Sequence, residues 1–507
     1  MFVAPPLRDT ILLPRKGKLN AGLLSTCLGL FISLSLWCLG CMAKEPYTYS
    51  HIQRAYAAEK PSFLARSQPP SKADFEVPST PISVAEAIKI ALRRNPDMDM
   101  ALTRVQQSEA MIDEAMAAFW PTLSAYGEYM QGDAPSAYLF RTIDQRKLPA
   151  GVDFNDPGWF ENYEIGLQGR INLFHGGRDV LRKRMAETGL KIHELDRQSI
   201  QNSLIASVIH AYYNTLAAQD FIQIAQESVG TVETQLRVME VRYQAGGVLK
   251  SDVLSLNVRL AQAREDLVRA RNDHSLSLAA LANLFGIDPD TPMTLAGPEG
   301  VSLDVPEDYQ QGLVYALGSR AELKKVRQQI VQSRMGVDMA RSEYWPRLDV
   351  QGKYYLDDAD LDFESERENW TAGIILNWDL FTGLSTTARV NKAKSILEEM
   401  LAADRKATLS VQLDLKTAYL KFAEAKARLA VTEASAAQAG ESLRLVKRQY
   451  EGGSATITRY LDAELACNRA RIRAAAAFYD REKALAALGR ALGYWGKYAK
   501  EALSTHE

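Results

Sequence analysis

The fold is decided by a segment that occurs twice, as Ala118-Phe119-Trp120-Pro121-Thr122-Leu123 and, 225 residues later, as Glu343-Tyr344-Trp345-Pro346-Arg347-Leu348. Further on, Asn172-Leu173-Phe174 matches Asp379-Leu380-Phe381 at an offset of 207 residues. The same offset relates three later pairs: Tyr212 and Tyr419, Tyr243 and Tyr450, Gly286 and Gly493. One offset held over more than a hundred residues indicates that the chain is an internal duplication.

The two copies differ in length between their shared motifs. The offset falls from 225 to 207, so the first copy carries 18 extra residues between its Trp-Pro pair and its Leu-Phe pair. Insertions are tolerated mainly in surface loops. We therefore expect a loop in this part of the first copy.

Each copy has the same order of elements. It begins with a helical run, Ser83 to Phe119 or Asp308 to Tyr344, which the Trp-Pro pair ends because proline cannot continue a helix. A proline-free stretch of 66 residues follows later, Arg178 to Tyr243 or Ser385 to Tyr450. At about 1.5 Å per residue, such a helix is about 100 Å long. A globular domain does not need helices of that length.

A glycine pair follows each long helix, Gly246-Gly247 in the first copy and Gly452-Gly453 in the second. Glycine is the usual residue where a helix ends and the chain reverses. A return helix then carries apolar or small residues at coiled-coil spacing. The predicted seams are Leu256, Leu260, Ala263, Leu267 and Ala270 in the first copy, and Leu461, Leu465, Asn468, Ile472, Ala475 and Tyr479 in the second.

Strands are predicted between the Trp-Pro pair and the long helix of each copy. Apolar residues alternate with polar ones at Tyr163, Ile165, Leu167, Gly169, Ile171 and Leu173, and again at Trp370, Ala372, Ile374, Leu376, Trp378 and Leu380. Alternation over about ten residues indicates a strand with one apolar and one polar face. Leu123 to Met130 and Leu348 to Tyr355 show the pattern more weakly, and we expect them to pair with these strands. The strand length suits a membrane β-strand, and a small water-soluble sheet is the alternative.

Composition and motifs do not point to catalysis. The net charge of −2 gives no reason to expect a nucleic acid partner. The sequence has no phosphate-binding loop, no nucleophile elbow and no metal-ligand spacing among its six histidines, so we expect no cofactor, no metal site and no enzyme. An acidic run between the last two strands (Asp357, Asp358, Asp360, Asp362, Glu364, Glu366 and Glu368) could hold a divalent cation, but we interpret it as a solvated loop.

The N-terminus has the parts of an export signal. Basic residues precede an apolar stretch, Ala21 to Gly40, which ends at Cys41 in a sequence that resembles a bacterial lipobox. An uncleaved membrane anchor is the alternative. The predicted organisation is a signal peptide at 1–40, a lipid-anchored extended arm at 41–82, the first repeat at 83–286, a connector at 287–307 with a short strand at Met293 to Leu295, the second repeat at 308–493 and a tail at 494–507.

Four strands cannot close a barrel, and an open sheet edge in lipid leaves backbone groups unpaired at a cost of several kcal/mol each. Three protomers would supply twelve strands, an even number within the range of bacterial outer-membrane barrels. The predicted fold class is therefore α+β and mainly α. Its duplicated unit combines coiled-coil helical hairpins with two membrane strands, and three chains form a 12-stranded β-barrel continuous with an α-helical tunnel.

From about Ser83 to Gly493 the chain resembles the TolC-like outer-membrane factors. The resemblance rests on the duplicated unit, the two Trp-Pro pairs, the Tyr-x-x-Gly reversals at Tyr243 and Tyr450, and Tyr460-Leu461-Asp462-Ala463. The lipobox resembles that of the lipid-anchored branch of the family. The resemblance implies a homotrimer in the outer membrane of a Gram-negative bacterium, docked to a periplasmic adaptor and an inner-membrane transporter. Such a trimer exports small molecules passively.

In this family the periplasmic tips of the helices form the gate. Carried over by position, Asp252 and Tyr450 would be partners in the closed state, and Asp462 would supply a ring of three carboxylates. The chain departs from the family pattern at two places: Arg459 stands where a second acid is common, and Ala455 where an arginine is common. Because of these departures, the resemblance does not determine which residues contact each other in the closed gate.

Three other functions stay open on the sequence. A type I protein secretion channel would have the same architecture and a different cargo. A periplasmic adaptor also uses long helical hairpins, but it would have one hairpin set within small β-domains. A purely structural coiled-coil protein would not need the strands.

Overall fold

The computed structural model describes residues 80–298, 303, 305–363 and 365–496, all of which belong to one unit of the chain, Val77–Glu507. The predictions for the signal peptide, for Cys41 and for the arm as far as residue 79 lie outside the described residues.

The helical run predicted in the first copy consists of two helices. Helix α3 spans Val84–Arg94 and α4 spans Pro96–Met116. Asn95 separates them, and its side-chain oxygen accepts a hydrogen bond of 2.8 Å from the N–H of Asp97. Pro96 fits the first turn of α4 because the N–H that it lacks has no partner within a helix at that position. The Asn-Pro pair in the sequence thus indicates where one helix ends and the next begins.

The second copy repeats this break at Arg320, between α8 (Tyr309–Ser319) and α9 (Ala321–Arg341). The guanidinium of Arg320 is buried and donates to Asp414 at 2.8 Å and to the carbonyl of Ala491 at 2.9 Å. A short 3₁₀ turn, Ala117–Phe119 (η3) or Ser342–Tyr344 (η4), leads from each helical run into its Trp-Pro pair.

Four antiparallel strands form one sheet in the order β1-β2-β3-β4. The strands are β1 (Thr122–Gly132), β2 (Phe160–His175), β3 (Arg347–Asp358) and β4 (Glu368–Asn377). The pairing predicted within each copy is confirmed, and β2 pairs with β3 to join the two copies. The connection between β1 and β2 contains a helix, α5 (Pro135–Asp144), and the one between β3 and β4 contains a 3₁₀ turn, η5 (Ser365–Arg367).

The register gives the sheet two different faces, as predicted. Opposite residues on neighbouring strands share a face, so the pairing of Glu164 with Glu128 and Asp357 defines the polar face. The apolar face carries residues such as Leu167, Trp370 and Ile374, whose exposed fractions are 48%, 74% and 70%. The apolar face of this chain is therefore largely uncovered.

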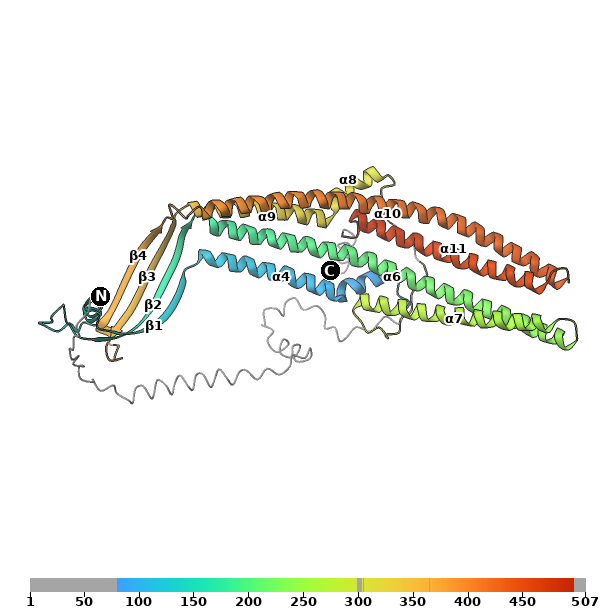
Figure 1. Ribbon diagram of the computed structural model, residues 1–507, viewed down its shortest axis with the longest axis horizontal. Helices are drawn as coiled ribbons and strands as arrows, with labels where there is room; N and C mark the ends of the chain where they lie inside the picture. The colour runs from blue at the N-terminus through green and yellow to red at the C-terminus, as the bar shows by residue number, and fades with distance from the viewer. Residues whose placement is uncertain (1–79, 299–302, 304, 364, 497–507) are drawn as a thin grey trace, which may run out of the picture. The chain divides into compact units, whose positions relative to one another are not determined.

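The long helices match their predictions closely. Helices α6 (Arg178–Gln244) and α10 (Ser385–Glu451) have 67 residues each, and α7 (Lys250–Phe285) and α11 (Ile457–Leu492) have 36 each. At about 1.5 Å per residue, α6 and α10 are each about 100 Å long. The sheet lies at one end of these two helices and the chain reversals lie at the other (Figure 1). None of the described helices combines the length and the apolar character needed to cross a bilayer.

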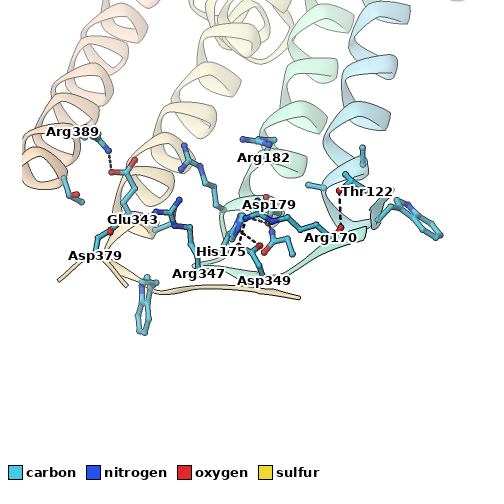
Figure 2. A pocket seen from close by; sticks show the side chains of 18 of the residues that line it. Thr122, Arg170, His175, Asp179, Arg182, Glu343, Arg347, Asp349, Asp379 and Arg389 are labelled. Carbon is cyan, nitrogen blue, oxygen red and sulfur yellow. Dashed lines mark hydrogen bonds and ion pairs between the residues drawn. The ribbon is translucent and has the colours of Figure 1, made fainter. Parts of the chain in front are cut away.

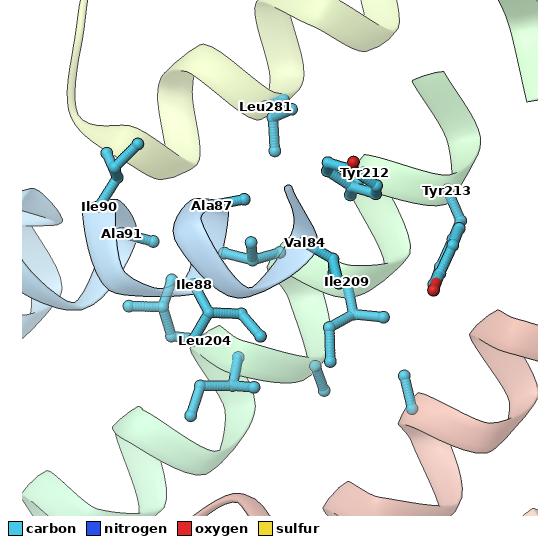
Figure 3. Packing of buried hydrophobic residues seen from close by; sticks show 14 of the residues in the cluster. Val84, Ala87, Ile88, Ile90, Ala91, Leu204, Ile209, Tyr212, Tyr213 and Leu281 are labelled. Carbon is cyan, nitrogen blue, oxygen red and sulfur yellow. The ribbon is translucent and has the colours of Figure 1, made fainter. Parts of the chain in front are cut away.

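The largest core cluster lies where α3 and the connector meet α6 and the ends of α7 and α11 (Figure 3). Tyr212 is fully buried there, and its hydroxyl donates to the carbonyls of Ile82 and Ala296, at 3.0 and 2.9 Å. Its counterpart Tyr419 donates to the carbonyl of Pro306 at 2.7 Å. Each duplicated tyrosine thus holds the segment that enters the first helix of its own copy.

The connector and the chain end also join this core. The short strand predicted at Met293 to Leu295 is reduced to a single parallel bridge between Ile82 and Leu295. Trp495, which the sequence placed just beyond the second repeat, is fully buried and donates to the carbonyl of Ala486 at 3.0 Å.

The seam predicted for the second return helix is right at Tyr479, which is buried, and wrong at Ile472. Helix α11 buries Tyr460, Cys467, Ala470 and Ala477, whereas Ile472 is 37% exposed. The buried alanines and Cys467 lie 207 residues after the seam of the first copy. Leu461 is only partly buried, and it packs against two clusters, one formed by α6 and α7 and the other at the tip of its own hairpin.

We expect the two faces of β4 to respond differently to charge if the apolar face meets lipid. Ile374→Arg should destabilise the assembled protein by about 2–4 kcal/mol, since an arginine near mid-membrane must leave water. Ile375→Arg is the matched control, because Ile375 lies on the polar face and should cost much less. The measurement is the yield of assembled protein in the outer-membrane fraction. Equal losses from both changes would show that the faces are assigned wrongly.

Candidate functional site

Each long helix ends in a Schellman reversal, in which one glycine has a positive φ. Gly246 (φ 74°) donates to the carbonyl of Tyr243 at 2.9 Å, and Gly247 donates to that of Arg242 at 2.8 Å. The second copy repeats this with Gly453 (φ 77°) and Ser454, whose N–H groups donate to Tyr450 and Gln449 at 3.0 and 2.8 Å. These bonds pair carbonyls that a helix end leaves free. The predicted reversals are confirmed, but Gly452 has an ordinary negative φ.

Asp252 lies in the first turn of α7. Its carboxylate accepts a hydrogen bond of 3.3 Å from the N–H of Leu249, the residue that precedes the helix. A carboxylate at this position also stabilises a helix by facing the positive end of its dipole. The contact accounts for an acid at this position without any gate.

Tyr450 is buried at the tip of the second hairpin. Its ring stacks on that of Tyr460 with centroids 5.5 Å apart, and its hydroxyl lies 3.5 Å from Sδ of Met239 on α6. The guanidinium of Arg242 lies 5.7 Å from the centre of the same ring. Within this chain, therefore, Tyr450 contacts α6 and α11, and its pairing with Asp252 stays a prediction.

Asp252 and Asp462 line one groove of about 210 Å³ between α7 and α11, together with Arg259. The structure thus brings together two acids that the sequence placed in separate copies. Arg459 is exposed, and its N–H donates to Oγ1 of Thr456, which caps the start of α11. Arg459 lies on the first turn of this helix.

Glu464 on α11 is a buried acid, 3% exposed, that was not predicted from the sequence. Its Oε1 accepts from Ser228 at 3.4 Å and from Asn468 at 3.3 Å, and its Oε2 has no hydrogen-bond partner among the described residues. Burial raises the pKa of Glu464 above its ordinary value, which favours the neutral form. The duplication carried no signal of this burial, because the counterpart of Glu464 at the offset of 207, Asn257, is exposed.

A second polar cluster lies where the sheet meets the helices (Figure 2). It surrounds a cavity of about 700 Å³ lined by residues of both copies. Arg170 on β2 forms an ion pair of 2.7 Å with Asp349 on β3, so a charge pair crosses the boundary between the copies. His175 lies between Asp349 and Asp179, at 3.4 and 3.6 Å. Arg389 on α10 pairs with Glu343, which anchors the second long helix to η4.

The acidic run between β3 and β4 is solvated only in part. Asp360, Asp362, Glu366 and Glu368 are exposed, as predicted, but the first two acids are not. Asp357 and Asp358 are fully buried at the end of β3. Asp357 accepts from Asn162 at 2.7 Å, and Asp358 pairs with Arg367 and accepts from the N–H of Asp360 at 2.8 Å. Among the described residues, no group of three or more His, Cys, Asp or Glu side chains could hold a metal ion.

Comparisons with known proteins show which sequences and structures this chain is similar to. The profile of the family described as outer membrane efflux protein matches residues 87–287 and 313–494. The pyoverdine export outer membrane protein OpmQ of Pseudomonas aeruginosa is 24% identical over 409 residues, covering 80% of this chain and 83% of OpmQ. The alkaline protease secretion protein AprF of the same species is 24% identical over 329 residues, covering 63% of this chain and 65% of AprF. The CmeC outer membrane channel of Campylobacter jejuni has the same fold, with a TM-score of 0.71 at 17% identity over 83% of this chain and 89% of CmeC.

We expect Gly453→Ala to destabilise the second tip by about 1–2 kcal/mol, because an L-residue with a side chain resists the left-handed conformation. The space around Gly453 is open, so the cost comes from the backbone alone. Gly452→Ala is the control and should be nearly neutral, since Gly452 has a negative φ and the first copy has Ala245 at the equivalent position. Hydrogen exchange of the amides in residues 446–456 measures the difference. Similar exchange in both variants would rule out this account of the reversal.

Proposed function

This chain belongs to the outer membrane efflux protein family, and on that premise we propose that it is one protomer of a trimeric exit duct in the outer membrane. The duct carries small molecules passively from an inner-membrane transporter and a periplasmic adaptor to the outside. The protomer acts as a wall and a gate, and we assign it no catalytic role.

The four-stranded sheet is the observation that carries the proposal. Its apolar face is exposed over Leu167, Trp370 and Ile374, while its polar face bears the charged groups. In a ring of copies, β1 of one chain would lie beside β4 of the next, which pairs both open edges and turns the apolar faces to lipid. Three chains give twelve strands, and the long helices extend the ring as a tunnel.

Cargo and partners are proposed from the family and from two relatives. OpmQ is named for pyoverdine export, which supports a small-molecule cargo. AprF is named for alkaline protease secretion, so a protein cargo is the second candidate. Lipid on Cys41 would tether each protomer to the outer membrane of a Gram-negative cell.

The helical tips form the proposed gate. Gly246 and Gly453 end the long helices, and the chain reversals lie at the far end of these helices from the sheet. With the sheet in the outer membrane, the tips would extend into the periplasm. The groove between α7 and α11 holds Asp252 and Asp462, and threefold symmetry would repeat it around one axis. We assign Asp252 and Tyr450 to the closed state, with Arg459 beside the opening.

The proposal is tested on the purified protein in detergent and in planar bilayers. We expect trimers that resist heating and ion conductance across the bilayer, because a closed ring of strands surrounds water. A protomer that stays monomeric, or a trimer that never conducts, would refute the exit duct. An adaptor or a structural coiled coil would give one of these two results.

Asp462 is expected to control cation block at the tip. Three carboxylates around one axis attract cations, so multivalent cations added on the periplasmic side should reduce conductance, and Asp462→Ala should weaken that block. Asp266→Ala is the control, since Asp266 is an exposed acid farther along α7. If Asp462→Ala leaves both the block and the ion selectivity unchanged, Asp462 is only a solvated residue of its helix.

A further inference from the structure

The helix inserted in the first copy, α5, lies against the polar face of the sheet. Arg141 of α5 is placed over three acids that are direct neighbours in the register, Glu128 on β1, Glu164 on β2 and Asp357 on β3. Its Nη1 lies 2.5 Å from Glu164 and 3.2 Å from Asp357, and its Nη2 lies 3.5 Å from Glu128. One guanidinium therefore spans three strands.

This arrangement has an electrostatic reason. Like charges at directly opposite positions of a sheet repel each other. Glu164 is 2% exposed and Asp357 is fully buried, so water screens this repulsion little. Arg141 supplies the compensating charge, together with Lys353, whose Nζ lies 3.3 Å from Glu164. Without Arg141 the row of acids would be left with excess buried charge.

Polar contacts hold the rest of this segment to the strands. Gln145 at the end of α5 is 3% exposed and donates to Oδ1 of Asn162 on β2 at 2.7 Å. Lys147 pairs with Asp360 at 2.7 Å, and Asn369 on β4 donates to the carbonyl of Asp144 at 3.2 Å. Together with the contacts of Arg141, these bonds attach the segment to all four strands at the end of the sheet away from the long helices.

The other side of α5 is apolar and open. Phe140 is 65% exposed and Ile143 is 40% exposed, whereas Arg141 and Gln145 contact the sheet. A helix with one side bonded to the sheet and an uncovered apolar side is poorly explained as a solvated loop. In a ring of copies, that apolar side would face the axis.

We propose that α5 is an internal constriction at the outer mouth of the duct, held against the wall by Arg141 as the positioning residue. The inference rests on the proposed function, which makes the polar face the inner wall. Three copies of α5 narrow the passage at the end opposite the helical tips. Wide cargo then meets a second restriction in series with the tips, and it passes when α5 leaves the row of acids.

The test measures access to the inner wall from outside intact cells. A reporter cysteine replaces Gln168, an exposed residue on the polar face of β2, in a background that carries Cys467→Ser. A small membrane-impermeant maleimide should label the reporter in the otherwise unchanged protein, and a polyethylene-glycol maleimide should label it slowly. Arg141→Gln should speed labelling by the large reagent about tenfold or more, because a buried acid left without its partner destabilises the docked helix.

Arg146→Gln is the matched control, since Arg146 is an exposed arginine of the same segment that donates to the carbonyl of Ile143. Labelling by the large reagent should stay at its original rate in this variant. Equal rates in Arg141→Gln and Arg146→Gln, in trimers that conduct, would overturn the constriction. A chain that forms no conducting trimer before any of these changes would contradict the proposed function instead.

A second variant covers the case in which Arg141→Gln does not assemble. It replaces residues 135–147 with a short Gly-Ser linker and carries Glu164→Gln and Asp357→Asn, because removing both partners of an ion pair is far less costly than removing one. We expect fast labelling by the large reagent and a higher single-channel conductance. Slow labelling in an assembled trimer without α5 would show that α5 does not restrict the mouth.

Discussion

Unpaired backbone groups at the edges of β1 and β4 constrain the rest of this molecule. In water, the exposed apolar face of the sheet would be unfavourable, and in lipid the open edges would cost several kcal/mol for each unpaired group. Pairing the edges with further copies of the chain satisfies both conditions at once. In the proposed duct the protomer is therefore a segment of a wall, and the exposed side chains of Trp370 and Ile374 belong to the surface that would lie in lipid.

Duplication explains how one chain can supply a wall of even height. Helices α6 and α10 have the same length, so both hairpins reverse at the same distance from the sheet. The two buried tyrosines, Tyr212 and Tyr419, hold equivalent segments by equivalent bonds. The two copies are thus alike in the features that set the length of the hairpins and the position of their first helices.

The two copies differ at the helical tips and in the insertion between the first two strands. Tyr243 is 43% exposed at the first reversal, while its counterpart Tyr450 is buried against Tyr460. Glu464 replaces Asn257, and the insertion that contains α5 exists in the first copy alone. These differences lie at the helical tips and at the end of the sheet away from the long helices, which would be the two mouths of the proposed duct.

By itself, the sequence determined the duplication, the two long helices, the reversals and the two faces of each strand, because these depend on local periodicity and on glycine and proline. It also carried the break at Asn95-Pro96, which the prediction overlooked. Tertiary structure alone decided the seam of α11, where small side chains such as Ala470 and Ala477 are buried and Leu461 packs against both hairpins. It also decided the burial of Asp357, which the sequence analysis placed in a solvated loop. Asp357 is buried beneath α5, and its charge partner is Arg141, which lies more than two hundred positions earlier in the chain.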